Sequence, residues 1–212
     1  MDVKQAYDHW SKQYDTNINL TRDLEAIAFR TVLTEINFDT CLEMGCGTGK
    51  NTEWLANRTK QITAVDLSNE MLTIAKKKIK AANVQFRKAD ILREWDFINE
   101  KYDLVSFSLV LEHIENLNSV FNKVSKVLNK EGHVYIGELH PFKQYTGSKA
   151  RFETNEGVQA VTCFNHHLSD FIHAAKNNGL SIADINEYFD NNDRTSVPRI
   201  LTLLLKNNQP VE

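Results

Sequence analysis

The fold is decided by one stretch of the sequence, Cys41-Leu42-Glu43-Met44-Gly45-Cys46-Gly47-Thr48-Gly49. It predicts a buried strand that ends in a tight turn, followed by a helix. The alternating glycines let the backbone approach a ligand closely, because glycine has no Cβ and adopts positive φ freely. The first N–H groups of the following helix are also unpaired. Glu43 precedes the first glycine by two residues, and because a carboxylate repels a phosphate, the turn suits a cationic ligand.

The composition fits one α/β domain, since 212 residues are enough for a full core. The formal net charge of −3 gives no electrostatic footprint for a nucleic acid or an anionic membrane as partner. The cysteines, Cys41, Cys46 and Cys163, lack metal-ligand spacing, so we expect no metal and reduced thiols in a cytoplasmic protein. We recognise no signal peptide or membrane span, and the sequence leaves the oligomeric state open.

The first 138 residues alternate strands with helical segments. The expected strands are 40–44, 61–65, 84–88, 102–108 and 132–137. This alternation predicts a parallel, doubly wound sheet with right-handed crossovers. Two more strands, 180–189 and 199–206, have no helix between them and must pair antiparallel. We therefore expect an α/β fold with a doubly wound, seven-stranded sheet, mostly parallel with an antiparallel C-terminal strand.

We expect a single domain over residues 1–212, with two additions around the sheet. The first is an N-terminal helical cap, 1–36, and the second is an insertion, 139–167, over the binding site. Aromatic side chains in the cap recur at i, i+3 and i+7 and so share one helical face. They are Tyr7, Trp10 and Tyr14. Such a stripe either packs in the core or covers a ligand as a lid.

Polar side chains follow successive strands at their carboxyl ends, where open α/β sheets bind ligands. Asp66 lies about 20 residues beyond the glycine turn, where a carboxylate accepts hydrogen bonds from two ribose hydroxyls. Asp90 could accept from the amine of an adenine, or it could cap the turn that follows. Met71 suits the face of a base, although it also belongs to an apolar helix face. Ser108 and Leu109 follow the fourth strand.

These motifs resemble the class I S-adenosylmethionine (SAM) dependent methyltransferases, above all their small-molecule, type 11/12-like group with the signature E-x-G-C-G-T-G. The similar runs are 42–49, 65–72, 88–91 and 102–114. The resemblance implies a Rossmann-like methyltransferase fold and SAM as cofactor, with S-adenosylhomocysteine as product. It places Glu43 at the amino end of the methionine part and Asp66 at the ribose. The cofactor-binding residues that it implies are Glu43, Gly45, Cys46, Gly47, Asp66, Leu67, Met71, Asp90, Ile91, Ser108 and Leu109.

The resemblance also implies in-line transfer of a methyl group to a small molecule, for which the protein must align the reactants and exclude water. A general base is needed only where the acceptor carries a proton. His140 and His167 are the candidate bases, unless they are structural or face solvent. Arg151 suits a carboxylate or phosphate on the substrate, unless it pairs with Glu153 or Glu156. The residues expected to bind substrate are Tyr7, Tyr14, His113, Tyr145, Arg151 and His166.

Two other functions compete with this interpretation. The domain could bind SAM without catalysis, as a regulatory subunit; a pocket that is open beside the sulfonium would argue for an enzyme. An NAD(P)-dependent oxidoreductase needs G-x-G-x-x-G, but the third glycine, Gly49, comes one position early and Lys50 stands in its place. The run 108–110 also differs from the Asn/Asp-Pro-Pro-aromatic run of enzymes that methylate amines in nucleic acids. The acceptor, and whether its O, N, C or S atom is methylated, stays open.

Overall fold

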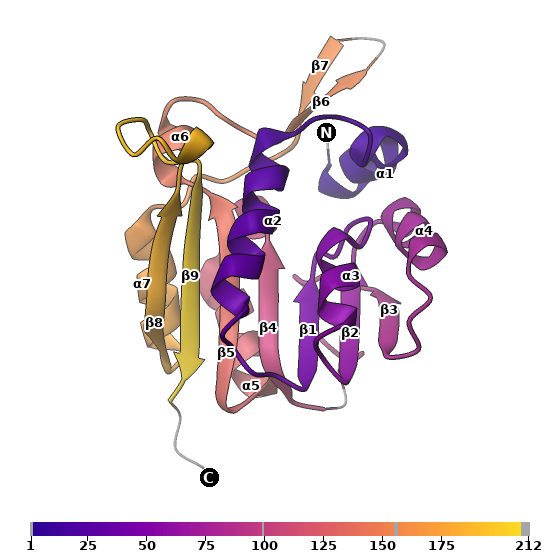
Figure 1. The fold of residues 1–212 in the computed structure, drawn as a ribbon, viewed down its shortest axis with the longest axis vertical. Helices are drawn as coiled ribbons and strands as arrows, with labels where there is room; N and C mark the ends of the chain where they lie inside the picture. Colours follow the sequence, from indigo (N-terminus) through magenta and orange to yellow (C-terminus); the bar gives the residue numbers. More distant parts are fainter. Residues whose placement is uncertain (1, 99, 155–156, 209–212) are drawn as a thin grey trace.

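A seven-stranded sheet in the order β3-β2-β1-β4-β5-β9-β8 forms the centre of the molecule (Figure 1). The computed structural model describes residues 2–98, 100–154 and 157–208. The strands of the sheet are β1 (Thr40–Met44), β2 (Gln61–Asp66), β3 (Val84–Lys88), β4 (Tyr102–Ser108), β5 (Leu128–Leu139), β8 (Leu180–Tyr188) and β9 (Ile200–Asn207). The strands from β3 to β5 pair in parallel, and β9 runs antiparallel to both β5 and β8. The expected mixed sheet is confirmed.

Helices cover both faces of this sheet (Figure 1). The helices on one face are α2 (Leu20–Leu33) and α3 (Lys50–Ala56), and those on the other are α5 (Leu117–Val127) and α7 (Leu168–Asn177). Successive side chains of a strand point to opposite faces. In β1, Cys41 accordingly belongs to the core under α2 and α3, whereas Leu42 and Met44 belong to the core under α5 and α7. Two apolar cores therefore hold the strands and leave the strand ends for a ligand.

The remaining helices are short or lie at the rim of the sheet. They are α1 (Val3–Tyr14), α4 (Asn69–Lys78), α6 (Pro141–Tyr145) and the 3-10 helices η1 (Leu111–His113) and η2 (Asp190–Asn192). The expected cap 1–36 divides into two parts, because α1 lies beyond the strand ends while α2 packs on the sheet (Figure 1). In the described part of the chain, no helix combines the length and the apolar character needed to cross a bilayer.

Two aspartates fasten α1 to the loops at the strand ends. The Ser68 hydroxyl donates to Asp8 Oδ1 at 2.5 Å. Asp15, directly after α1, accepts from the Thr48 hydroxyl at 2.6 Å and pairs with Lys78 Nζ at 2.8 Å. Thr48 belongs to the glycine turn and Ser68 caps α4, so α1 is tied to both loops that surround the candidate site.

The insertion 139–167 forms a helix and a hairpin rather than a strand of the main sheet. The hairpin pairs β6 (Arg151–Thr154) with β7 (Gly157–Ala160) in a separate antiparallel sheet. Figure 1 shows this hairpin projecting beyond the strand ends, near α1. After β7 the chain passes η1, where the Phe164 N–H donates to the Glu112 carbonyl at 2.7 Å.

Candidate active site

A cavity of about 220 Å³ lies beyond the carboxyl ends of the parallel strands. Nearly all residues expected to bind a cofactor line it; they are Gly45, Gly47, Asp66, Leu67, Met71, Asp90, Ile91, Ser108 and Leu109. Tyr7, Tyr14 and His113, which were expected on the substrate side, line it as well. The described lining does not include Glu43 or Cys46. The strand-end rule therefore located the cavity, but two of the residues expected in its wall are not part of the described lining.

The glycine turn needs glycine for two separate reasons. Gly45, Gly47 and Gly49 all have positive φ, at 72°, 53° and 86°, a region that strains other residues. A Cβ on Gly45 would also lie 2.3 Å from Val110 Cγ2, whereas a Cβ on Gly47 would meet nothing within 4 Å. The first glycine is therefore required by sterics as well as by conformation, and the turn presses directly against the loop after β4.

Asp66 fixes the same turn from the neighbouring strand. Its Oδ2 accepts from the Gly47 N–H and its Oδ1 from the Ser68 N–H, both at 2.8 Å. Burial nevertheless raises the pKa of Asp66 to about 6, against the lowering effect of these hydrogen bonds. The carboxylate thus lines the cavity in a fixed orientation, and a hydroxyl or cationic ligand there would favour its charged form.

Two further buried carboxyl groups lie behind the cavity wall. Burial, above all, raises the pKa of Glu43 to about 8, and the charges of Glu25 and Asp66 add to the effect. Glu43 Oε2 accepts from the Thr52 hydroxyl at 2.5 Å. Burial also raises the pKa of Glu25 to about 7, and the Ser108 hydroxyl donates to it at 2.5 Å. Each of these groups gains charge most readily when a positive ligand occupies the cavity.

Sequence reasoning missed Glu25, which α2 brings to Ser108 from far along the chain. Helix α2 buries Glu25 and Phe29 but leaves Ile27 57% exposed, so hydrophobicity alone misplaces its inner face. A usable signal was the spacing of Glu25, one helical turn before Phe29. Asn19 begins the helix, because its side chain accepts from the N–H groups of the first turn.

Asp90 and Met71 both line the cavity as expected, and each also has the structural role that was its alternative. Asp90 lines the cavity, but its Oδ1 accepts from the Leu92 N–H at 2.9 Å and so caps the turn. Met71 is fully buried and also lines the cavity. The capping role of Asp90 and the burial of Met71 are thus compatible with a base bound between the two side chains.

The loop after β4 is held by Glu138 at the end of β5. Glu138 accepts from the N–H groups of Val110, Leu111 and Glu112, at 2.9, 2.7 and 3.3 Å. Burial is the main reason why the pKa of Glu138 is raised to about 8. Leu109, with φ at 55°, turns the chain into this cradle. Glu138 is therefore a positioning residue for the wall that faces the glycine turn.

Tyr7 and His113 meet at the boundary of the cavity. The Tyr7 hydroxyl lies 2.9 Å from His113 Nε2, and His113 Nδ1 lies 2.8 Å from the Thr162 carbonyl. Because a carbonyl only accepts, Nδ1 carries the proton and Nε2 accepts from Tyr7. The fold also brings the ligand atoms of Glu112, His113 and Cys163 within 4.8 Å of one another, which sequence spacing did not show. Both nitrogens of His113 are already bonded, so this group offers a metal no free imidazole.

A second cavity, of about 410 Å³, adjoins the first. The two cavities share Tyr7, Tyr14 and Leu109 in their walls. Its other walls come from α1, the start of α2, η1 and the segment 148–151. Tyr7, Tyr14 and Leu109 therefore stand between the first cavity and a separate chamber.

Comparisons with known proteins agree with this geometry. The family model described as "Methyltransferase domain" matches residues 42–136. A malonyl-[acyl-carrier protein] O-methyltransferase from Acetivibrio thermocellus is 29% identical, over 66% of this chain and 54% of its own length. The matching domain and the named relatives support a class I SAM-dependent methyltransferase. It spans about half the length of most of the curated methyltransferases that it matches.

Solved methyltransferase structures share the fold. A SAM-dependent methyltransferase from Listeria monocytogenes has a TM-score of 0.75 at 21% identity, covering 88% of this chain and 99% of that one. The N-methyltransferase NodS from Bradyrhizobium japonicum, solved with S-adenosylhomocysteine, has a TM-score of 0.74 at 18% identity, covering 99% and 100%. At these identities the likeness concerns the fold alone.

The residues present fit SAM, the cofactor that the resemblance to methyltransferases implies. SAM carries a sulfonium and an ammonium group, and burial raises the pKa of the carboxyl groups at the cavity, so a cationic ligand would favour their charged forms. A Cβ on Gly47 would meet nothing within 4 Å, so the backbone at this lining residue is open to a ligand.

Other expected site residues of the methyltransferase lie elsewhere. His140 caps α6, and its Nε2 lies 3.0 Å from Glu187 Oε1. His167 Nδ1 lies 2.6 Å from the Tyr145 hydroxyl at the surface, and His166 Nε2 lies 2.7 Å from the Ile114 carbonyl. The described linings of the two cavities do not include His140, Tyr145, His166 or His167. His140 was suggested by its place after the fifth strand, and His166 and His167 by their place at the end of the insertion, but among these histidines and His113 it is His113 that is in the described lining of the first cavity.

Proposed function

We propose that this protein transfers a methyl group from SAM to a small-molecule acceptor in the second cavity. When bound, SAM supplies an electrophilic methyl group on a sulfonium. The observation that carries the proposal is the shared wall of the two cavities, because a displacement needs an acceptor in line with the donor. A non-catalytic SAM-binding domain would not need the second chamber.

The residues of the first cavity have separate roles in this proposal. Asp66 accepts from the ribose hydroxyls, while Asp90 and Met71 hold the adenine. Glu25 and Glu43 stabilise the positive end of the cofactor from behind the wall. Cys46, Leu67 and Ile91 contribute to the turn and the apolar walls around them. This division follows from the burial and position of each side chain.

Tyr7 and His113 provide the proton acceptor where the methyl acceptor has to lose a proton. Nε2 of His113 accepts from the Tyr7 hydroxyl, and both residues line the first cavity. Removal of that hydrogen bond by an incoming acceptor would leave Nε2 free to take a proton. We keep His140 and His167 as the alternative bases, and we place the protein in the cytoplasm because Cys41, Cys46 and Cys163 are free thiols.

Calorimetry with SAM and Asp66→Asn tests the cofactor assignment. We expect the Kd to rise more than tenfold, because the amide keeps only part of the acceptor capacity of Asp66. Asp96→Asn is the matched control, since Asp96 is exposed and outside both described cavity linings. Equal affinity of the Asp66 variant and the control would refute the ribose assignment. A screen of small molecules with labelled SAM then tests methyl transfer itself, and failure of the protein to bind SAM at all would refute the proposed function.

A further inference from the structure

The second cavity has an unusual balance of charge for a protein with net charge −3. Its positively charged lining residues are Arg22, Lys149, Arg151 and Arg199. Glu112 is the one carboxyl group in its described lining. Burial raises the pKa of Glu112, so that group resists carrying the opposing negative charge.

Arg199 is the cation in this lining that a carboxylate already neutralises. It makes a bidentate pair with Asp190, from Nε and Nη2 at 2.5 and 2.6 Å. Arg22 donates instead to the backbone carbonyls of Tyr14 and Asn17 and lies 4.1 Å above the Tyr14 ring. These partners are uncharged, so the charge of Arg22 acts on the cavity.

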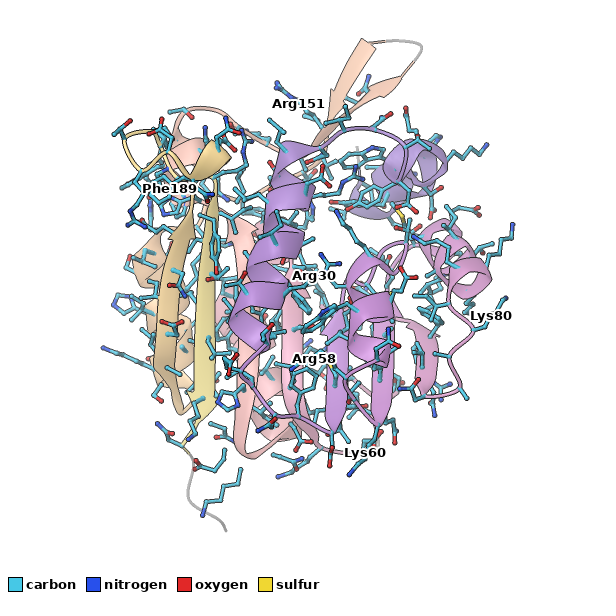
Figure 2. The ribbon with its side chains drawn as sticks, in the orientation of Figure 1. Arg30, Arg58, Lys60, Lys80, Arg151 and Phe189 are labelled. Carbon is cyan, nitrogen blue, oxygen red and sulfur yellow. The ribbon has the colours of Figure 1, made fainter. Side chains whose placement is uncertain are left out.

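Lys149 and Arg151 line the same cavity, Lys149 just before the β6–β7 hairpin and Arg151 as the first residue of β6. Figure 2 shows Arg151 at the foot of this hairpin, above the N-terminal end of α2. Within the described residues, neither side chain has a hydrogen-bond or ion-pair partner. The alternative partners expected for Arg151, the side chains of Glu153 and Glu156, lie outside the described structure.

The start of α2 adds to this positive field. Asn19, Leu20 and Thr21 line the cavity at the N-terminal end of a 14-residue helix. The helix macrodipole places partial positive charge there. Aromatic side chains of α1, from Tyr7, Trp10 and Tyr14, form another part of the lining. The chamber therefore combines an apolar wall with a cationic one, and a matching ligand has an apolar body and an anionic group.

We propose that the second cavity selects methyl acceptors that carry an anionic oxygen group, a carboxylate or a phosphate, which Arg22, Lys149 and Arg151 bind. This rests on the proposed function, because it makes the second cavity the acceptor site. An arginine fork matches either anion in bidentate geometry. The anion would anchor the acceptor at the cationic wall, and the end to be methylated would reach the shared wall at Tyr7, Tyr14 and Leu109.

The test is an NMR titration of the full-length, isotope-labelled protein saturated with S-adenosylhomocysteine. Inorganic phosphate and benzoate are added separately at constant ionic strength, because salt screens exposed charges. We expect saturable shifts of backbone amides near Thr21 and Lys149 with at least one anion. The anion that binds more tightly identifies the preferred group. Absence of a saturable shift with both anions would overturn the proposal.

Variants separate a built site from general attraction to a positive surface. Arg151→Gln and Lys149→Gln are each expected to raise the Kd of the bound anion at least fivefold. Arg87→Gln and Lys101→Gln are the matched controls, since both residues are exposed and outside the described lining of either cavity. Equal losses in variants and controls would overturn the proposal. A protein that binds S-adenosylhomocysteine but no anion loses only this inference, whereas one that does not bind S-adenosylhomocysteine loses the proposed function.

Discussion

Gly45→Ala tests the argument that the glycine turn is closed by both strain and contact. The new Cβ would sit at a φ of 72° and 2.3 Å from Val110 Cγ2. Left-handed backbone costs a residue other than glycine about 1–2 kcal/mol, and overpacking typically costs about 1–3 kcal/mol more. We therefore expect the free energy of unfolding to fall by about 2–5 kcal/mol, measured by urea denaturation of the ligand-free protein.

Gly147→Ala is the matched control, because it has the strain without the contact. Gly147 has a φ of 89°, and a Cβ there would meet nothing within 4 Å. We expect this variant to lose only about 1–2 kcal/mol. Adding Val110→Ala to Gly45→Ala removes the two methyl groups that the new Cβ meets, so a double-mutant cycle should show about 1–3 kcal/mol of relief. A coupling energy near zero, or equal losses for the two glycine variants, would refute the steric argument.

Four further results are expected. Burial raises the pKa of Glu43 to about 8 in the free protein, so a cationic ligand expels its proton. Calorimetry should therefore show SAM binding up to about tenfold tighter at pH 7 than at pH 6. Glu43→Gln should show a smaller dependence of the affinity on pH. By the same linkage, the folded ligand-free protein holds this proton more tightly than the unfolded chain, so its unfolding free energy should fall as pH rises from about 5 to 8; a flat profile would contradict the raised pKa. Glu138→Ala leaves three buried N–H groups without their acceptor and should lower the unfolding free energy by about 2–4 kcal/mol in urea, and a loss below that range would mean that water replaces the carboxylate. Asn19→Ala removes the cap of α2 and should cost about 1 kcal/mol in thermal unfolding, with exposed Asn17→Ala as the comparison variant.

The parts of the site that sequence reasoning found are those fixed by local rules. Glycines at positive φ, and acidic residues at strand ends, depend on a few neighbouring residues, so Gly45, Asp66 and Asp90 could be placed before the fold was known. The mixed sheet followed in the same way, its parallel part from the alternation of strand and helix and its antiparallel part from the hairpin that joins β8 to β9; the order of the strands was not predicted.

The parts that sequence reasoning missed depend on contacts between distant segments. Glu25 reaches Ser108 only because α2 packs across β5 and β9, and a single buried carboxylate leaves no periodic signal. His140 was considered because it follows the fifth strand, and His167 because it ends the strand-like part of the insertion. His140 is buried beside Glu187, whereas His113 meets Tyr7 of α1. Tertiary packing decided both cases.

Helix α1 forms a wall of both cavities, through Tyr7 and Tyr14. The polar contacts that hold this helix and its C-terminal end in place include Asp8 to Ser68, Asp15 to Thr48 and Lys78, and Tyr7 to His113. Displacing this one helix would expose both chambers to solvent together. In the proposed function, the cofactor and the acceptor would then enter and leave past the same helix. Lys78 and Asp15 are partly exposed, so higher ionic strength should weaken their ion pair. The rate of turnover would then depend on how often α1 moves away from the cavities as well as on how well the reactants align.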